Sequence, residues 1–147
     1  MIVGGGIGGL AAGVAPRRVG VETLIVEQVA AIREVGAGLS IWSNAMKTIR
    51  ELGVEVKVMA AASVIERSLS QSLDGHRIVV TDFSAISRKA GVASISVHRA
   101  VLQRVLFEEL PPESILTWSI RPPSSRRIRS PRPQVRLAKD AARLPPV

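Results

Sequence analysis

The pattern of apolar and polar positions predicts a strand, a glycine-rich loop, a helix and a second strand at the start of the chain. Residues 1–3 form the end of a buried apolar run, and a second, β-branched run covers residues 21–26. A helix-like stretch opens at Leu10 between these two runs. Pro16 lacks a backbone donor, so we expect this helix to kink or to end near Val14.

The middle of the chain predicts a β-hairpin. Residues 65–73 and 77–83 are strand-like, and the dipeptide Asp74-Gly75 lies between them. Both residues of that dipeptide tolerate the positive φ angles that tight hairpin turns need. The following segment, residues 84–92, is predicted to be a loop.

Two further helices are predicted from apolar positions at helical spacing. The first covers residues 43–53 and ends at Gly53. The second opens at Arg99, and its buried face is formed by Val101, Leu102, Val105 and Leu106. We expect His98, just before this helix, to be a polar residue at the end of a strand rather than a base or a metal ligand.

Charge and proline change character at Leu110. The net charge of +8 divides into +2 over residues 1–110 and +6 over residues 111–147, and eight of the nine prolines lie in the second part. This joint shift predicts a domain boundary, with a folded part at 1–110 and a basic, disordered tail at 111–147. A length of 147 residues allows one domain of ordinary size.

Several classes of function are excluded or disfavoured by composition. The chain contains no cysteine and two histidines, which excludes a disulfide scaffold, a thiolate zinc site and a cysteine nucleophile, and no metal site is predicted. The uncharged residues 1–16 lack a basic start and fall short of the ~20 residues that span a bilayer, which disfavours a signal or membrane segment. A cytoplasmic location fits this composition.

The strongest candidate site is the pattern Gly4-x-Gly6-x-x-Gly9, placed between a strand and a helix. Gly4 would allow the tight turn, Gly6 the approach of a pyrophosphate, and Gly9 close packing of helix against strand. The helix N-terminus would attract the phosphates. Glu27, at the end of the second strand, would accept hydrogen bonds from a ribose and repel a 2′-phosphate. The alternative is a glycine-rich turn of an ordinary α/β protein, with Glu27 exposed to solvent.

Two more segments, residues 33–53 and 94–110, complete a resemblance. Together with IVGGGIGGLA they resemble the N-terminal part of FAD-dependent aromatic-ring hydroxylases, the salicylate-hydroxylase-like flavoprotein monooxygenases. The resemblance covers most of residues 1–110. It implies a partial Rossmann-like FAD/NAD(P)-binding α/β fold, with the hairpin and the basic Pro/Arg-rich tail added.

The resemblance also implies cofactors, a substrate class and binding residues. FAD would be reduced by NAD(P)H, and the substrate would be a small aromatic molecule; catalytic residues and oligomeric state stay unassigned. The implied cofactor-binding residues are Gly4, Gly6 and Gly9 at the pyrophosphate, Glu27 at the adenosine ribose, Gln28 beside the adenosine, Arg99 on FAD, and Arg33 and Ala37 in the segment that passes the flavin.

The resemblance stops at Leu110, where the family continues with a further strand and later motifs. We therefore expect a truncated or frame-shifted product whose parallel strands lack a later neighbour, and which is not a competent hydroxylase alone. One alternative is an NAD-dependent oxidoreductase that uses the same loop. Another alternative is a fragment that binds nucleic acid through arginines of the tail, namely Arg126, Arg127, Arg129 and Arg132. The tail has no recognisable nucleic-acid-binding module, so a solvated basic coil is favoured.

Overall fold

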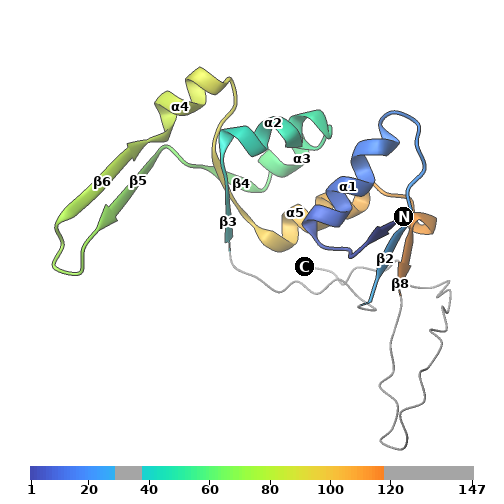
Figure 1. Cartoon of the computed structure of the whole chain (residues 1–147). Helices are drawn as coiled ribbons and strands as arrows, with labels where there is room; N and C mark the ends of the chain where they lie inside the picture. The colour runs from blue at the N-terminus through green and yellow to red at the C-terminus, as the bar shows by residue number, and fades with distance from the viewer. Residues whose placement is uncertain (29–37, 118–147) are drawn as a thin grey trace, which may run out of the picture. The chain divides into compact units, whose positions relative to one another are not determined.

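A computed structural model of the chain describes residues 1–28 and 38–117 (Figure 1). The chain divides into two units. Unit 1 comprises residues 1–33 and 106–147, and unit 2 comprises residues 34–105. Each unit has its own sheet, and each is described separately below.

Unit 1 contains a parallel sheet with the strand order β1-β2-β8. Its strands are β1 (Ile2–Val3), β2 (Ile25–Glu27) and β8 (Ile115–Thr117). Ile25 pairs with Ile2 on one side and with Ile115 on the other, so β2 is the central strand. The predicted β-α-β order at the start of the chain is confirmed, although β2 begins later than the apolar run from residue 21.

Helix α1 (Ile7–Arg17) connects β1 to β2 and buries Leu10 and Val14. The helix does not end near Val14 as expected, since it continues through Pro16 to Arg17. Pro16 is the residue before the last, so its missing N–H removes only one donor, and its fixed φ suits the helix. The turn then closes through tighter bonds, with the Arg18 N–H donating to the Ala15 carbonyl at 3.2 Å.

Strand β8 corrects a second expectation, that the parallel strands have no neighbour from beyond Leu110. The chain turns through a short 3₁₀ helix (Pro112–Ser114) and then enters β8. Arg17 Nη1 donates to the buried Ser114 Oγ at 3.2 Å, which ties the end of α1 to this turn. A strand of three residues is too short to show a period of two, so the sequence pattern did not reveal it. The predicted division at Leu110 and the predicted tail stay predictions, since residues 118–147 lie outside the described part.

Unit 2 contains an antiparallel sheet with the strand order β3-β7-β4 and two helices beside it in the chain. Their bounds are β3 (Gly38–Ile41), α2 (Ser43–Glu51), α3 (Glu55–Met59), β4 (Ala62–Val64) and β7 (Ile95–His98). The predicted helix over 43–53 is confirmed as α2, and Gly53 follows it with a φ of +77°. The buried apolar residues of this unit include Ile41, Met46, Ile49, Leu52, Val54, Val58, Val92, Ile95 and Val97.

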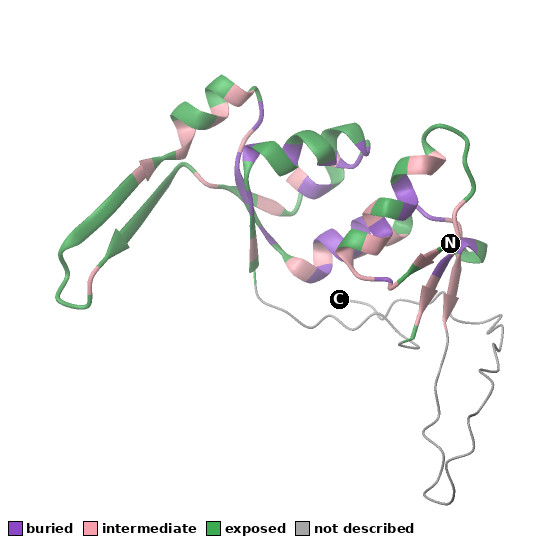
Figure 2. Cartoon of the chain, viewed as in Figure 1, coloured by how far each residue is buried: buried purple, intermediate pink, exposed green. Residues whose placement is uncertain are grey.

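The predicted hairpin is present as β5 (Arg67–Gln71) and β6 (Arg77–Asp82). Gly75 adopts a φ of +87° in the turn, which confirms the prediction made from the Asp-Gly dipeptide. All residues of β5 and all but one of β6 are exposed, and Figure 2 shows the hairpin almost entirely in the exposed colour.

The segment after the hairpin, predicted to be a loop, forms helix α4 (Phe83–Ala90), so that prediction is wrong. The helix is specified by its ends. Asp82 Oδ1 accepts hydrogen bonds from the Ser84 and Ala85 amides at 2.9 and 3.2 Å, and Gly91 closes the other end with a φ of +72°. No residue of α4 is buried.

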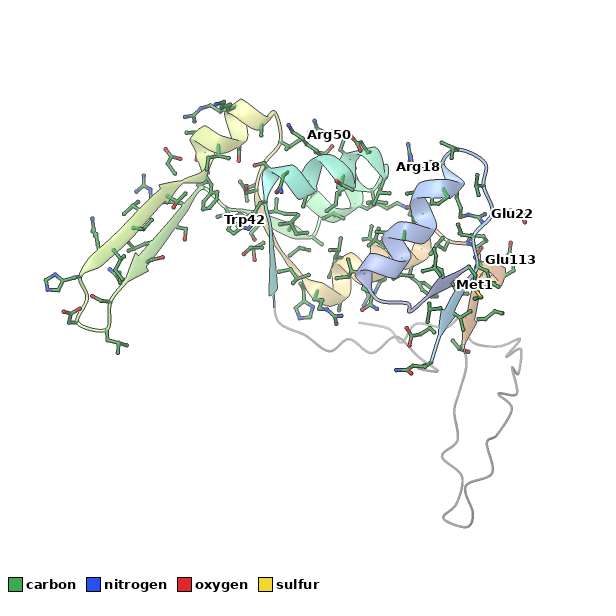
Figure 3. All side chains as sticks on the ribbon, viewed as in Figure 1. Met1, Arg18, Glu22, Trp42, Arg50 and Glu113 are labelled. Atoms are coloured by element: carbon green, nitrogen blue, oxygen red, sulfur yellow. The ribbon has the colours of Figure 1, made fainter. Side chains whose placement is uncertain are left out.

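Two side-chain contacts join the helices of unit 2. Trp42, which caps the start of α2, stacks on Phe83 at the start of α4 with 4.6 Å between ring centroids. Arg50 at the end of α2 donates two hydrogen bonds to the Glu55 carboxylate of α3, at 2.7 and 2.8 Å. Trp42 and Arg50 are labelled in Figure 3. These contacts connect the base of the hairpin to the helices that cover the sheet.

Helix α5 (Arg99–Glu108) begins at the predicted residue, and Leu102, Val105 and Leu106 are buried as expected, whereas Val101 is only half-buried. His98 ends β7, and its Nδ1 accepts from the Ala100 amide at 3.3 Å. This capping contact agrees with the prediction that His98 is a polar residue at the end of a strand.

The cap of α4 predicts a pH dependence. The amides of Ala85 and Ser84 hold the pKa of the Asp82 carboxyl below its ordinary value. The stabilisation of α4 is therefore complete above the ordinary aspartate pKa and is lost as the pH falls through the lower, folded-state pKa. We expect the amide chemical shift of Ser84 to titrate with a midpoint below the ordinary pKa of an aspartate. Asp82→Asn keeps an acceptor and should remove this titration; a midpoint above the ordinary value contradicts the cap.

Candidate functional site

The candidate site is the turn between β1 and α1, formed by Gly4, Gly5 and Gly6. Gly4 adopts a φ of +103°, which only glycine adopts without strain. Its amide donates to the Val26 carbonyl at 2.8 Å, which keeps the turn next to β2. The chain thus leaves the carboxyl end of β1 and enters a helix within three residues. This is the geometry predicted for Gly4.

Helix α1 presents its N-terminus at this turn. Gly6 is the N-cap residue, no side chain caps the helix, and its first turn contains no acidic residue. The first amides of a helix have no partner within the helix, and they carry a partial positive charge. A Cβ placed on Gly6 would meet nothing within 4 Å, so there is space over the turn. The arrangement suits an anion such as a phosphate group.

Gly9 sets how closely the helix approaches the strand. A Cβ at this position would lie 1.9 Å from the Gly4 carbonyl oxygen, closer than any real contact. Gly13, one turn further along, is similarly close to β2: a Cβ there would lie 2.7 Å from Ile25 Cδ1. The GxxxG spacing of Gly9 and Gly13 therefore serves the packing of α1 against the parallel sheet.

Glu27 reaches the turn from the end of β2. Its Oε2 accepts a hydrogen bond from the Gly5 amide at 2.5 Å, across 22 residues of sequence. A Cβ on Gly5 would lie 3.2 Å from that oxygen, so a side chain at Gly5 would press on the carboxylate. The sequence pattern treats Gly5 as a variable position and missed this contact. The run of five glycines within residues 4–9 was the available signal.

Four predicted site residues remain, namely Gln28, Arg33, Ala37 and Arg99. Gln28 is exposed and is the residue that directly follows Glu27 at the end of β2. Arg99 begins α5 and belongs to unit 2, so no distance relates it to the loop of unit 1. Arg33 and Ala37 lie outside the described residues.

Within the described residues, two features were sought and not found, a metal-binding cluster and a membrane-spanning helix. Among them, no group of three or more histidine, cysteine, aspartate or glutamate side chains is arranged to hold a metal ion. None of the helices in residues 1–28 and 38–117 has the length and apolar character that crossing a membrane requires.

Comparison with known proteins assigns the family. The profile of the FAD binding domain family matches residues 1–116, which is most of the chain. The aurachin C monooxygenase/isomerase of Stigmatella aurantiaca is 43% identical over 108 residues, and the FAD-dependent urate hydroxylase of Mycolicibacterium vanbaalenii is 36% identical over 111 residues. Each match covers 74% of this chain and 28% of the relative.

Solved structures show the same relationship. Klebsiella pneumoniae HpxO, solved in complex with FAD and uric acid, superposes with a TM-score of 0.63 at 27% identity over 78% of this chain and 29% of its own. The p-nitrophenol 4-monooxygenase of Pseudomonas putida, at 15% identity and a TM-score of 0.69, shares the fold.

The chain belongs to the FAD-binding domain family of FAD-dependent monooxygenases. The predicted Rossmann-like α/β fold, the predicted family and FAD as its cofactor are confirmed. The chain spans a little over a quarter of the length of the relatives it matches.

The close approach of α1 to the Gly4 carbonyl at Gly9 can be tested by comparing alanine substitutions at Gly9 and at the neighbouring Gly8. We expect Gly9→Ala to lower the free energy of unfolding by about 2 kcal/mol or more, because the methyl group meets backbone that has no space to move. Gly8→Ala is the matched control, since a Cβ there meets nothing within 4 Å and alanine favours a helix. Urea unfolding followed by far-UV circular dichroism measures both. Equal stability of the two variants would contradict the packing described here.

Proposed function

We propose that the turn of Gly4, Gly5 and Gly6 binds the pyrophosphate of FAD and that Glu27 binds the adenosine ribose. The observation that carries this proposal is the hydrogen bond from the Gly5 amide to Glu27, which sets a carboxylate beside the anion-binding turn. A pyrophosphate joined to a ribose has an anionic group beside hydroxyl donors. The site has amide donors for the anion and, beside them, a carboxylate acceptor for the hydroxyls.

Each residue has a defined task in this proposal. Gly6 leaves the space that the pyrophosphate occupies, and the amides at the start of α1 donate to its oxygens. Gly9 allows α1 to begin close enough to β1 for those amides to reach it. Gln28, exposed after β2, lies beside the adenosine. Arg99 contacts FAD elsewhere, and Arg33 and Ala37 lie along the flavin, as the family resemblance implies.

Bound FAD would supply the redox chemistry of a monooxygenase. We propose that the chain serves as the FAD-binding part of an NAD(P)H-dependent enzyme that hydroxylates a small aromatic ring. Support comes from the names of relatives, which include a urate hydroxylase, and from the HpxO complex with uric acid. We also propose a cytoplasmic location.

The two alternatives have less support. An NAD-dependent oxidoreductase would use the same turn and carboxylate, but the family profile and the relatives are those of FAD proteins. Nucleic-acid binding would depend on arginines of residues 118–147, which lie outside the described structure. Neither alternative explains the resemblance of unit 2 to flavin monooxygenases.

Titration of the purified chain with FAD tests the proposal. We expect FAD to bind in preference to NAD, and Gly6→Val to raise the Kd for FAD by about 100-fold, because its side chain fills the pyrophosphate space at a cost of ~3 kcal/mol. Ala15→Val, on the exposed far end of the same helix, adds similar bulk and should bind FAD normally. Flavin fluorescence quenching gives both constants. Normal FAD binding by Gly6→Val, or a preference for NAD, would overturn the assignment.

A further inference from the structure

Glu27 has a partner before any nucleotide arrives. Its Oε2 accepts from the Gly5 amide, a hydrogen bond in which the acceptor is a carboxylate. Such bonds are roughly twice as strong as bonds between neutral groups. The contact joins the end of β2 to a buried residue of the turn.

The backbone on the Glu27 side of this contact is held firmly. Glu27 ends the central strand of the parallel sheet, where Val26 pairs with Val3 and with Leu116, and Glu27 itself pairs with Thr117. Strand pairing on both sides fixes where the side chain of Glu27 begins. The carboxylate is therefore attached to the most constrained strand of unit 1, whereas the turn is a short connection rich in glycine.

The Gly5 side of the contact is also shaped for it. A Cβ on Gly5 would lie 3.2 Å from Oε2 and 3.3 Å from both the Cβ and the Cγ of Glu27. These distances are tighter than most real Cβ contacts, so the glutamate stem lies flat against the glycine. A position that the motif leaves variable is thus restricted by the carboxylate. The hydrogen bond therefore requires a carboxylate at position 27 and a residue without a side chain at position 5.

We infer that Glu27 is a positioning residue for the anion-binding turn as well as the ribose ligand of the proposed function. The inference rests on that proposed function. By holding the Gly5 amide, the carboxylate sets the direction of the turn, so that Gly6 and the start of α1 face the pyrophosphate before it binds. A carboxylate has acceptor sites for about four hydrogen bonds, so one group can hold the turn and accept from a ribose hydroxyl. Organising the turn in advance lowers the entropic cost of binding.

The two roles of Glu27 make different predictions for a ligand that lacks the ribose 2′-hydroxyl. If Glu27 acts through the ribose alone, Glu27→Ala should lose affinity for FAD but none for FAD with a 2′-deoxyadenosine. If it also positions the turn, Glu27→Ala should bind that 2′-deoxy analogue about tenfold more weakly than the wild-type chain does. Glu27→Gln keeps a neutral acceptor and should restore part of the loss. Glu22→Ala, an exposed carboxylate before β2 (Figure 3), is the control and should change neither affinity.

A measurement without any nucleotide tests the hydrogen bond directly. In the wild-type chain, the Gly5 amide should exchange with solvent at least about tenfold more slowly than in Glu27→Ala, as expected when a charged acceptor is lost. Glu22→Ala should leave this exchange rate unchanged. A rate that is equal in wild type and Glu27→Ala would overturn the inference, whether or not FAD binds.

The outcomes separate the two claims. A 2′-deoxy analogue that binds wild type and Glu27→Ala equally well overturns the positioning role and leaves FAD binding intact. A wild-type chain that binds no FAD overturns the proposed function, and the exchange rate of the Gly5 amide then decides the positioning role alone. A tenfold loss on the analogue together with faster exchange supports the inference.

Discussion

The candidate site depends on one steric constraint, the contact distance between α1 and the carboxyl end of β1. The Gly4 carbonyl occupies the space that any side chain on Gly9 would need, since a Cβ there would lie 1.9 Å from its oxygen. Only with this close approach can the helix begin three residues after the strand and direct its first amides to the turn. The dipole of α1, the space over Gly6 and the contact with Glu27 all follow from that position.

The constraint explains why the sequence alone was informative about unit 1. Gly4 is needed for a positive φ, Gly6 for open space and Gly9 for close packing. Each need is local, so it is visible in the sequence as glycine at a fixed spacing. The need for glycine at position 5 is not visible in the local sequence, because it comes from contact with Glu27, which is 22 residues away in the sequence. A long-range contact of this kind leaves no local pattern.

Short and exposed elements were the least predictable. Strand β8 has three residues and follows two prolines, and helix α4 has eight residues, none of which is buried. Helix α4 is specified by Asp82 at one end and Gly91 at the other. Among the longer elements with a buried face, α2 is predicted close to its observed bounds and α5 from its observed first residue.

The two units relate differently to the family. Unit 1 contains the turn, the helix N-terminus and the carboxylate of the candidate site, so its proposed role can be argued from contacts within it. Unit 2 contains an exposed hairpin and most of the segments that resemble the flavin monooxygenases, and the FAD contact proposed for its Arg99 rests on that resemblance. The matched region covers 28% of the length of these relatives, so their whole activity is a proposal for this chain.

A residue-by-residue map of FAD binding tests the central claim most directly. Two-dimensional ¹H–¹⁵N spectra of the chain, recorded while FAD is added, report every backbone amide separately. We predict that the largest shifts fall on Gly5, Gly6 and Ile7, where the turn meets the start of α1. Shifts that are largest on the hairpin or on α4, or spectra that FAD leaves unchanged, would contradict the account.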